Sequence, residues 1–152
     1  MNLGLDSVIF GQQREQLRRV FVDVWRKQRQ SAVLEPMEQT IASVIGAHPQ
    51  YHGVLADPAS PHRDFSLEGS ETNPFLHMAM HIAIMEQLQT NRPVGIRAAY
   101  DALRSGFQGT HELEHAMMEC LSESLREAHE HNRAPDEQAY LACIRRLQRR
   151  VL

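Results

Sequence analysis

Histidines are frequent in this chain, and their spacing suits metal binding. The 152 residues include nine histidines, and on three occasions two of them stand four positions apart. These pairs are His48 with His52, His77 with His81, and His111 with His115. Chance alone predicts roughly half a pair. Residues i and i+4 of a helix share one face, so both imidazoles of a pair can reach one ion.

The pair His77 and His81 lies between Phe75 and Met85, in a segment that is apolar nearly all round. This pattern is typical of a buried helix. Each buried imidazole then needs a hydrogen-bond partner or a metal, because an unsatisfied buried polar group costs about 1–3 kcal/mol. Core histidines bonded to backbone or carboxylate groups are the alternative. The presence of two histidines rather than one favours a metal.

A second candidate site is the segment from His111 to His115, which matches the HExxH pattern. In zinc peptidases this spacing places two histidines on the ion and makes the glutamate, here Glu112, the general base. Glu119 extends the row His111, His115, Glu119 by one more helical turn, and its carboxylate could serve the same ion or a second one. The downstream glycine and third histidine of the long metzincin form are absent.

The helical wheel leaves the position of this second row open. The apolar stripe formed by Leu113, Met117 and Leu121 lies on the opposite side of the helix from His115. The row is therefore either a polar outer face or a flank that packs against the helix of His77 and His81.

The third pair is interrupted by Pro49. If this proline starts a new turn, His52 comes within reach of a metal site; the alternative is a histidine on a surface loop. Cys120 and Cys143 stand alone on predicted helices without CxxC spacing, and we interpret them as buried apolar residues.

Apolar residues recur with helical spacing in six segments, and none of the sequence shows the period-two alternation of a strand. The predicted helices span residues 6–27, 36–46, 74–89, 93–106, 108–131 and about 134–150. A long loop is predicted for residues 48–72, where Pro, Gly and Ser are frequent. The prediction is an all-α fold, a single-domain bundle of five or six helices over residues 1–152.

Composition excludes several classes of protein. With 42% apolar and 23% charged residues, the chain is typical of a globular domain. No apolar run is long enough to span a membrane, and we see no secretory signal. A net charge of −3 argues against nucleic-acid binding. Two cysteines cannot form a disulfide framework, so we expect the cytoplasm, and a partly apolar surface leaves a homodimer open.

Three segments carry a resemblance to a known family. They are Asn73 to His77 with His81, His48 to His52, and His111 to His115 followed by Met117 to Cys120. With them, the chain resembles, over nearly its whole length, a family of short bacterial proteins catalogued only as a domain of unknown function. That resemblance implies no activity and transfers no catalytic residue. A looser similarity links the site residues to hemerythrin-like and ferritin-like bundles, which hold iron with inward histidines and carboxylates.

The leading hypothesis is a helical bundle that binds one or two divalent transition metals, zinc or iron, for redox or hydrolytic chemistry. The candidate ligands are His77, His81, His111, His115, Glu119 and His52. The rival hypothesis is a non-enzymatic interaction protein with structural histidines. A zinc peptidase that uses Glu112 ranks third, since the edge strand that aligns peptides in such enzymes is missing from the pattern.

Overall fold

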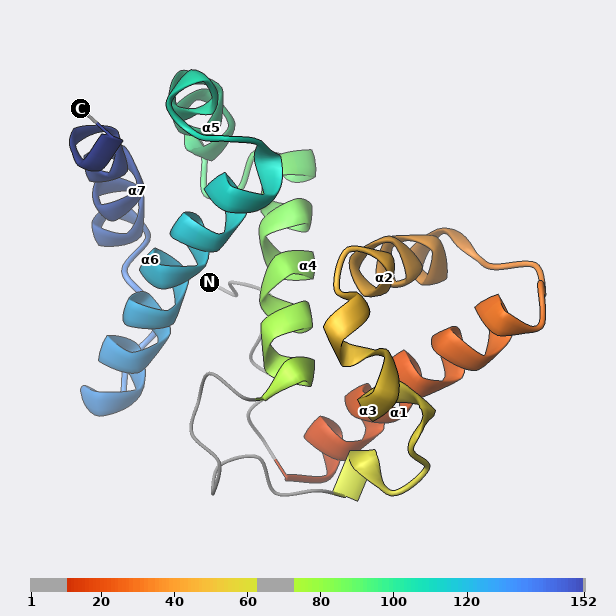
Figure 1. The fold of residues 1–152 in the computed structure, drawn as a ribbon. Coiled ribbons are helices and arrows are strands. Elements are labelled where there is room, and N and C mark those ends of the chain that lie inside the picture. Colours follow the sequence, from red (N-terminus) through yellow and green to blue (C-terminus); the bar gives the residue numbers. More distant parts are fainter. Residues whose placement is uncertain (1–10, 63–72, 152) are drawn as a thin grey trace. The chain divides into compact units, whose positions relative to one another are not determined.

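The computed structural model describes residues 11–62 and 73–151 (Figure 1). These residues form seven α-helices and no strand, so the predicted all-α class is confirmed, with slightly more helices than expected. The predicted helix start at residues 6–10 and the last part of the predicted loop, residues 63–72, lie outside the described residues.

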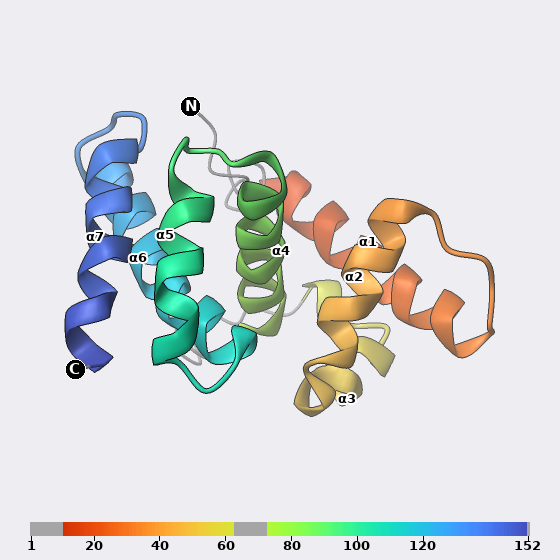
Figure 2. The ribbon, with the colours of Figure 1, turned by 90° about the horizontal axis from the view of Figure 1, so that it is seen from above.

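Figures 1 and 2 show the order of the helices along the chain. The α-helices are α1 (Gly11–Arg29), α2 (Pro36–Gly46), α3 (His52–Ala56), α4 (Pro74–Thr90), α5 (Ile96–Leu103), α6 (Thr110–Glu130) and α7 (Glu137–Val151). The 3₁₀ turns are η2 (Pro49–Tyr51), η3 (Ser60–His62) and η6 (Arg104–Gly106). Five of the six predicted long helices therefore correspond closely to α1, α2, α4, α6 and α7.

Two boundaries differ from the prediction. The helix expected from Pro93 begins at Ile96, because Gly95 takes a left-handed φ of 104° that a right-handed helix cannot contain. The first part of the predicted loop contains η2, α3 and η3. Pro49 and Pro61 both lie in such short turns, where the fixed φ of proline favours helical geometry.

The chain divides into two compact units, with the boundary between Ile82 and Ala83 inside α4. In the unit that ends at Ile82, α1 packs against α2, α3 and η3. Its core includes Phe21, Ile45 and Phe75, each at most 1% exposed. That the chain is a single domain stays a prediction.

In the unit that begins at Ala83, α7 packs against both α5 and α6. Its apolar core contains, among others, Ile84, Ile96, Leu113, Met117, Leu121 and Ile144. Within this core, Tyr140 donates a 2.6 Å hydrogen bond to Gln87, and burial raises the pKa of the Tyr140 phenol above its usual range. The hydroxyl therefore remains a donor at neutral pH.

A disulfide joins Cys120 of α6 to Cys143 of α7, with a Cα–Cα distance of 5.8 Å. The interpretation of the cysteines as isolated apolar residues is therefore wrong. The two residues lie 23 positions apart, on helices that meet only in the tertiary structure. Spacing along the chain could not show this contact. In the described residues, no helix is long and apolar enough to cross a membrane.

Replacing Cys143 with Ser should destabilise the protein under non-reducing conditions. In the chain-entropy model, a cross-link over 23 residues contributes about 3 kcal/mol to the free energy of unfolding. Urea denaturation followed by circular dichroism should report a loss of that order. A strong reductant should bring the wild-type protein to the same midpoint and leave the variant unchanged. Equal midpoints for both proteins without reductant would contradict the prediction.

Candidate metal centre

His77 and His81 lie one turn apart in the first half of α4. The helix starts as the sequence predicts: Pro74 is its first residue, and the Asn73 side chain accepts the backbone N–H of Leu76 at 3.1 Å. His81 is 2% exposed and His77 is half-buried. Their ring centroids are 5.0 Å apart. The start of α4 therefore fixes the position of both imidazoles.

His48 joins this pair from the end of α2. Its side chain is 1% exposed, and its ring centroid lies 5.0 Å from that of His77 and 4.7 Å from that of His81. One nitrogen from each of the three rings can be chosen so that all lie within 4.8 Å of one another. Three buried or half-buried imidazoles thus form a cluster inside the unit that ends at Ile82, which we call the histidine cluster.

A hydrogen bond fixes the tautomer of His48. Its Nδ1 lies 2.8 Å from the carbonyl oxygen of Val44, which can only accept. Nδ1 therefore carries the proton, and Nε2 carries the lone pair in the neutral ring. Metal-binding histidines typically show this arrangement, in which the second ring nitrogen donates to a backbone carbonyl and orients the ring.

Tyr51 forms one wall of the histidine cluster. Its ring stacks on His48 at 5.4 Å with an angle of 6° between the planes, and its edge meets His77 at 5.8 Å. Burial raises the pKa of the Tyr51 phenol, so this side chain stays neutral near pH 7. The 3₁₀ turn that begins at Pro49 brings Tyr51 back over His48. The wall therefore limits solvent access without adding charge.

His48 is a member of the cluster that the sequence analysis does not propose as a ligand; it proposes His52 of the same pair instead. A signal was present: Ile41, Val44, Ile45 and His48 follow the helical period of the buried face of α2. His52 is half-buried and lies outside the cluster. Its Nε2 donates to the carbonyl of Ile45 at 3.0 Å, and its ring packs on Trp25 with centroids 4.4 Å apart.

The row on α6 lies in the other unit. His111, Glu112 and Glu119 are exposed and His115 is half-buried. The rings of His111 and His115 are 4.2 Å apart between centroids. In the described part of the chain, no group of three or more candidate ligands includes His111, Glu112 or Glu119. Their roles as ligands or base stay predictions.

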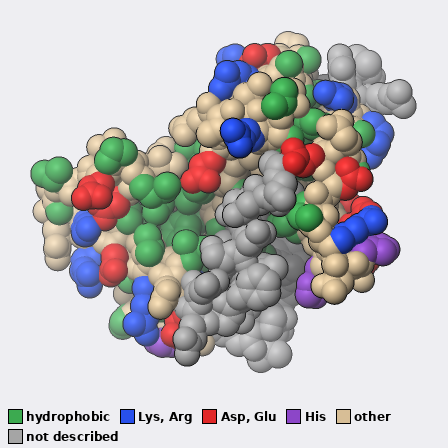
Figure 3. Space-filling model, turned by 180° about the vertical axis from the view of Figure 1, so that it is seen from behind, with side chains coloured by type: hydrophobic (Ala, Val, Ile, Leu, Met, Phe, Trp, Pro, Cys, Tyr) green, Lys and Arg blue, Asp and Glu red, His purple; other side chains and the backbone are tan. Residues whose placement is uncertain are grey.

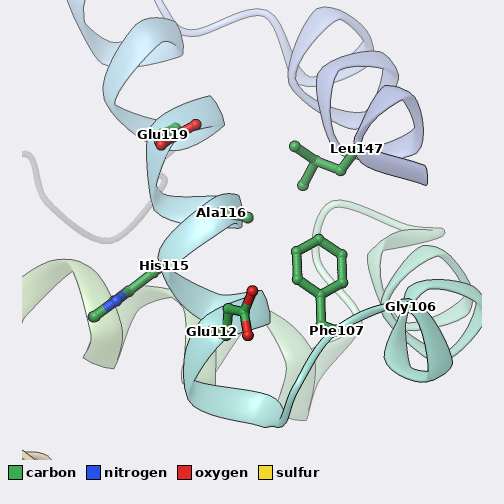
Figure 4. A pocket seen from close by; sticks show the side chains of 7 residues that line it. All are labelled: Gly106, Phe107, Glu112, His115, Ala116, Glu119 and Leu147. Atoms are coloured by element: carbon green, nitrogen blue, oxygen red, sulfur yellow. The ribbon is translucent and has the colours of Figure 1, made fainter. Parts of the chain in front are cut away.

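Glu112 has a local structural task. Its carboxylate accepts the backbone N–H of Gln108 at 3.2 Å, just before the first turn of α6. Glu112 also lines an open pocket of about 410 Å³ with Phe107, His115, Glu119 and Leu147 (Figure 4). In Figure 4 the His115 ring points away from Phe107 and Leu147. This carboxylate therefore stabilises the start of α6.

The comparisons with known proteins agree with the resemblance seen in the sequence. A family model described as a domain of unknown function, DUF1841, matches residues 13–146. Neither the curated proteins nor the solved structures contain a significant match. The matched segment covers all three residues of the histidine cluster and both cysteines of the disulfide. The chain therefore belongs to the DUF1841 family.

Proposed function

We propose that this protein binds a divalent transition metal through His48, His77 and His81. The observation that carries the proposal is the histidine cluster itself, in which ligand atoms of all three rings lie within 4.8 Å of one another. Two nitrogens on one tetrahedral zinc ion lie about 3.4 Å apart, as Zn–N bonds of 2.0–2.1 Å require. Binding of a metal would therefore draw the ring nitrogens closer together than their present separation of up to 4.8 Å.

A metal explains the cluster better than a purely structural role does. The three rings converge on one point, two of them from α4 and His48 from just after the end of α2. Protonation of several of them would place like charges side by side in a buried site, which is costly. A shared cation instead uses three neutral imidazoles as donors.

The donor set favours zinc. Three imidazoles suit Zn²⁺, and non-haem iron sites commonly include a carboxylate. Zinc with three histidines and an open fourth position would act as a Lewis acid for hydrolysis, whereas a fourth protein ligand would make the site structural. Iron, the second metal predicted from the sequence, would need a carboxylate as an additional ligand.

We also propose His115 as a metal ligand. It is the one half-buried member of the row His111, His115, Glu119, whereas the other two are exposed. An imidazole that is partly withdrawn from water gains more from a metal bond than an exposed one. His111, which is its neighbour on α6, provides a matched control.

The cellular setting is part of the proposal. The absence of nucleic-acid and membrane partners is supported by the net charge of −3 and by the interspersed acidic and basic side chains in Figure 3, whereas a bacterial, cytoplasmic setting stays a prediction. Disulfides are uncommon in reducing compartments. Trapping the thiol state of Cys120 and Cys143 in cells therefore tests this setting directly.

Elemental analysis should find about one equivalent of metal, with zinc expected, in protein purified without a histidine tag. Replacing His77 and His81 together with Ala should remove it, because two of the three ligands are lost. The control replaces His129 and His131, which are exposed at the end of α6, and should keep the metal. Retained metal in the first double variant would overturn the assignment, and absence of metal even after reconstitution would favour the interaction protein.

Removing the metal should lower thermal stability. A ligand that binds only the folded state at 100 times its Kd adds about 2.7 kcal/mol, equivalent to about 5–10 °C in Tm for a chain of this size. Differential scanning calorimetry with and without a chelator should show this shift in the wild-type protein. In the His77→Ala, His81→Ala variant the chelator should have no effect. An equal shift in both proteins would place the metal elsewhere.

Cobalt substitution tests His115 as a ligand. Tetrahedral Co²⁺ absorbs strongly in the visible range, and a change in its ligand set moves and weakens that band. His115→Ala should alter the spectrum and lower the affinity for Co²⁺ by about 10-fold, whereas His111→Ala should leave both unchanged. The opposite pattern would assign the role of ligand to His111 instead. Unchanged spectra in both variants would refute His115 as a ligand.

A further inference from the structure

The disulfide lies at a pocket in the unit that begins at Ala83. The pocket has a volume of about 210 Å³ and is lined by residues of α6, α7 and their connection, including Cys120 and Cys143. Cys120 is 2% exposed, whereas Cys143 is half-buried. A small molecule in this pocket can therefore approach the sulfur of Cys143 more easily than that of Cys120.

The charged side chains around the pocket determine which ligand it can bind. The lining includes Arg133, Arg146, Glu123, Glu127 and Asp136. Four of these five already have partners. Arg133 is bonded to Glu127 at 2.8 Å, Glu123 forms an ion pair with a neighbour on α6, and Asp136 accepts two backbone N–H groups at the start of α7.

Arg146 is the cation that remains for a ligand. It is exposed, stands three residues after Cys143 on α7, and forms no ion pair with the described part of the chain. Residues i and i+3 of a helix are neighbours on its surface. A carboxylate bound by Arg146 would therefore sit within a side chain's reach of the disulfide.

We propose that Cys143 is a thiol–disulfide exchange site for a small thiol that carries carboxylates. The thiolate of that molecule attacks Sγ of Cys143, a new S–S bond forms, and the Cys120–Cys143 bond breaks. The electron pair leaves on Sγ of Cys120, which then takes a proton from water. A second thiolate attacks the sulfur of the bound small thiol, releasing a small-molecule disulfide and the Cys143 thiolate, so two electrons pass from two thiols to the protein.

Access decides which cysteine forms the mixed disulfide. Exchange rates depend on which sulfur an incoming thiolate can reach, and Cys143 is the more exposed of the two. Opening the bond removes the covalent link between α6 and α7 and leaves their packing contacts in place. The exchange therefore changes the stability of this unit, independently of the metal proposed above.

The test uses glutathione, a thiol with two carboxylates, on the full-length protein. Peptide mapping by mass spectrometry after incubation in a glutathione redox buffer should find the adduct on Cys143. With Cys120→Ser, the remaining Cys143 should react with glutathione disulfide about 10-fold faster than Cys120 does in Cys143→Ser. Reaction of Cys120 at an equal or higher rate would overturn the proposal, as would a disulfide that opens only in denaturant.

The role of Arg146 is tested without changing either cysteine. Arg146→Gln should slow reduction by glutathione about 3-fold, while the control Arg145→Gln, which is also exposed on α7 but lies outside the pocket lining, should not. The uncharged thiol 2-mercaptoethanol should reduce wild-type and Arg146→Gln protein at the same rate. Equal rates with glutathione in all three proteins would refute recognition of the carboxylate by Arg146.

Discussion

A neutral imidazole that is withdrawn from water needs a donor for one ring nitrogen and an acceptor for the other, and this requirement organises the candidate site. In His48 the protonated nitrogen, Nδ1, finds its acceptor four residues earlier in the chain, at the carbonyl oxygen of Val44 2.8 Å away. That bond sets the ring plane and directs the lone pair of Nε2. The stacking of Tyr51 and the approach of His77 and His81 both build on this fixed ring.

The two units of the chain carry different kinds of chemistry. The unit that ends at Ile82 holds three imidazoles in an apolar setting, which suits a bound cation. The unit that begins at Ala83 holds a covalent link between α6 and α7 beside charged side chains. One proposal concerns a divalent metal and the other a small thiol, so each can be tested and refuted without the other.

Much of the fold could be predicted from the sequence because its signals are local. Asn73 and Pro74 mark the start of α4, and the apolar period of α2 and α6 marks their buried faces. The start of α5 is less clear from the sequence. Proline at position 93 favours a helix start, but the left-handed φ at Gly95 delays α5 to Ile96. Short turns such as η2 and α3 have too few residues to show a period.

By itself the sequence determined the all-α class, most helix boundaries and the pairing of His77 with His81, since each depends on residues within one or two turns. Only the tertiary structure decided that His48 rather than His52 completes the cluster, and that Cys120 and Cys143 meet. Both outcomes depend on where one helix ends relative to another. A helical period tells which face is buried, but the neighbouring helix that covers this face is set by packing of the whole unit.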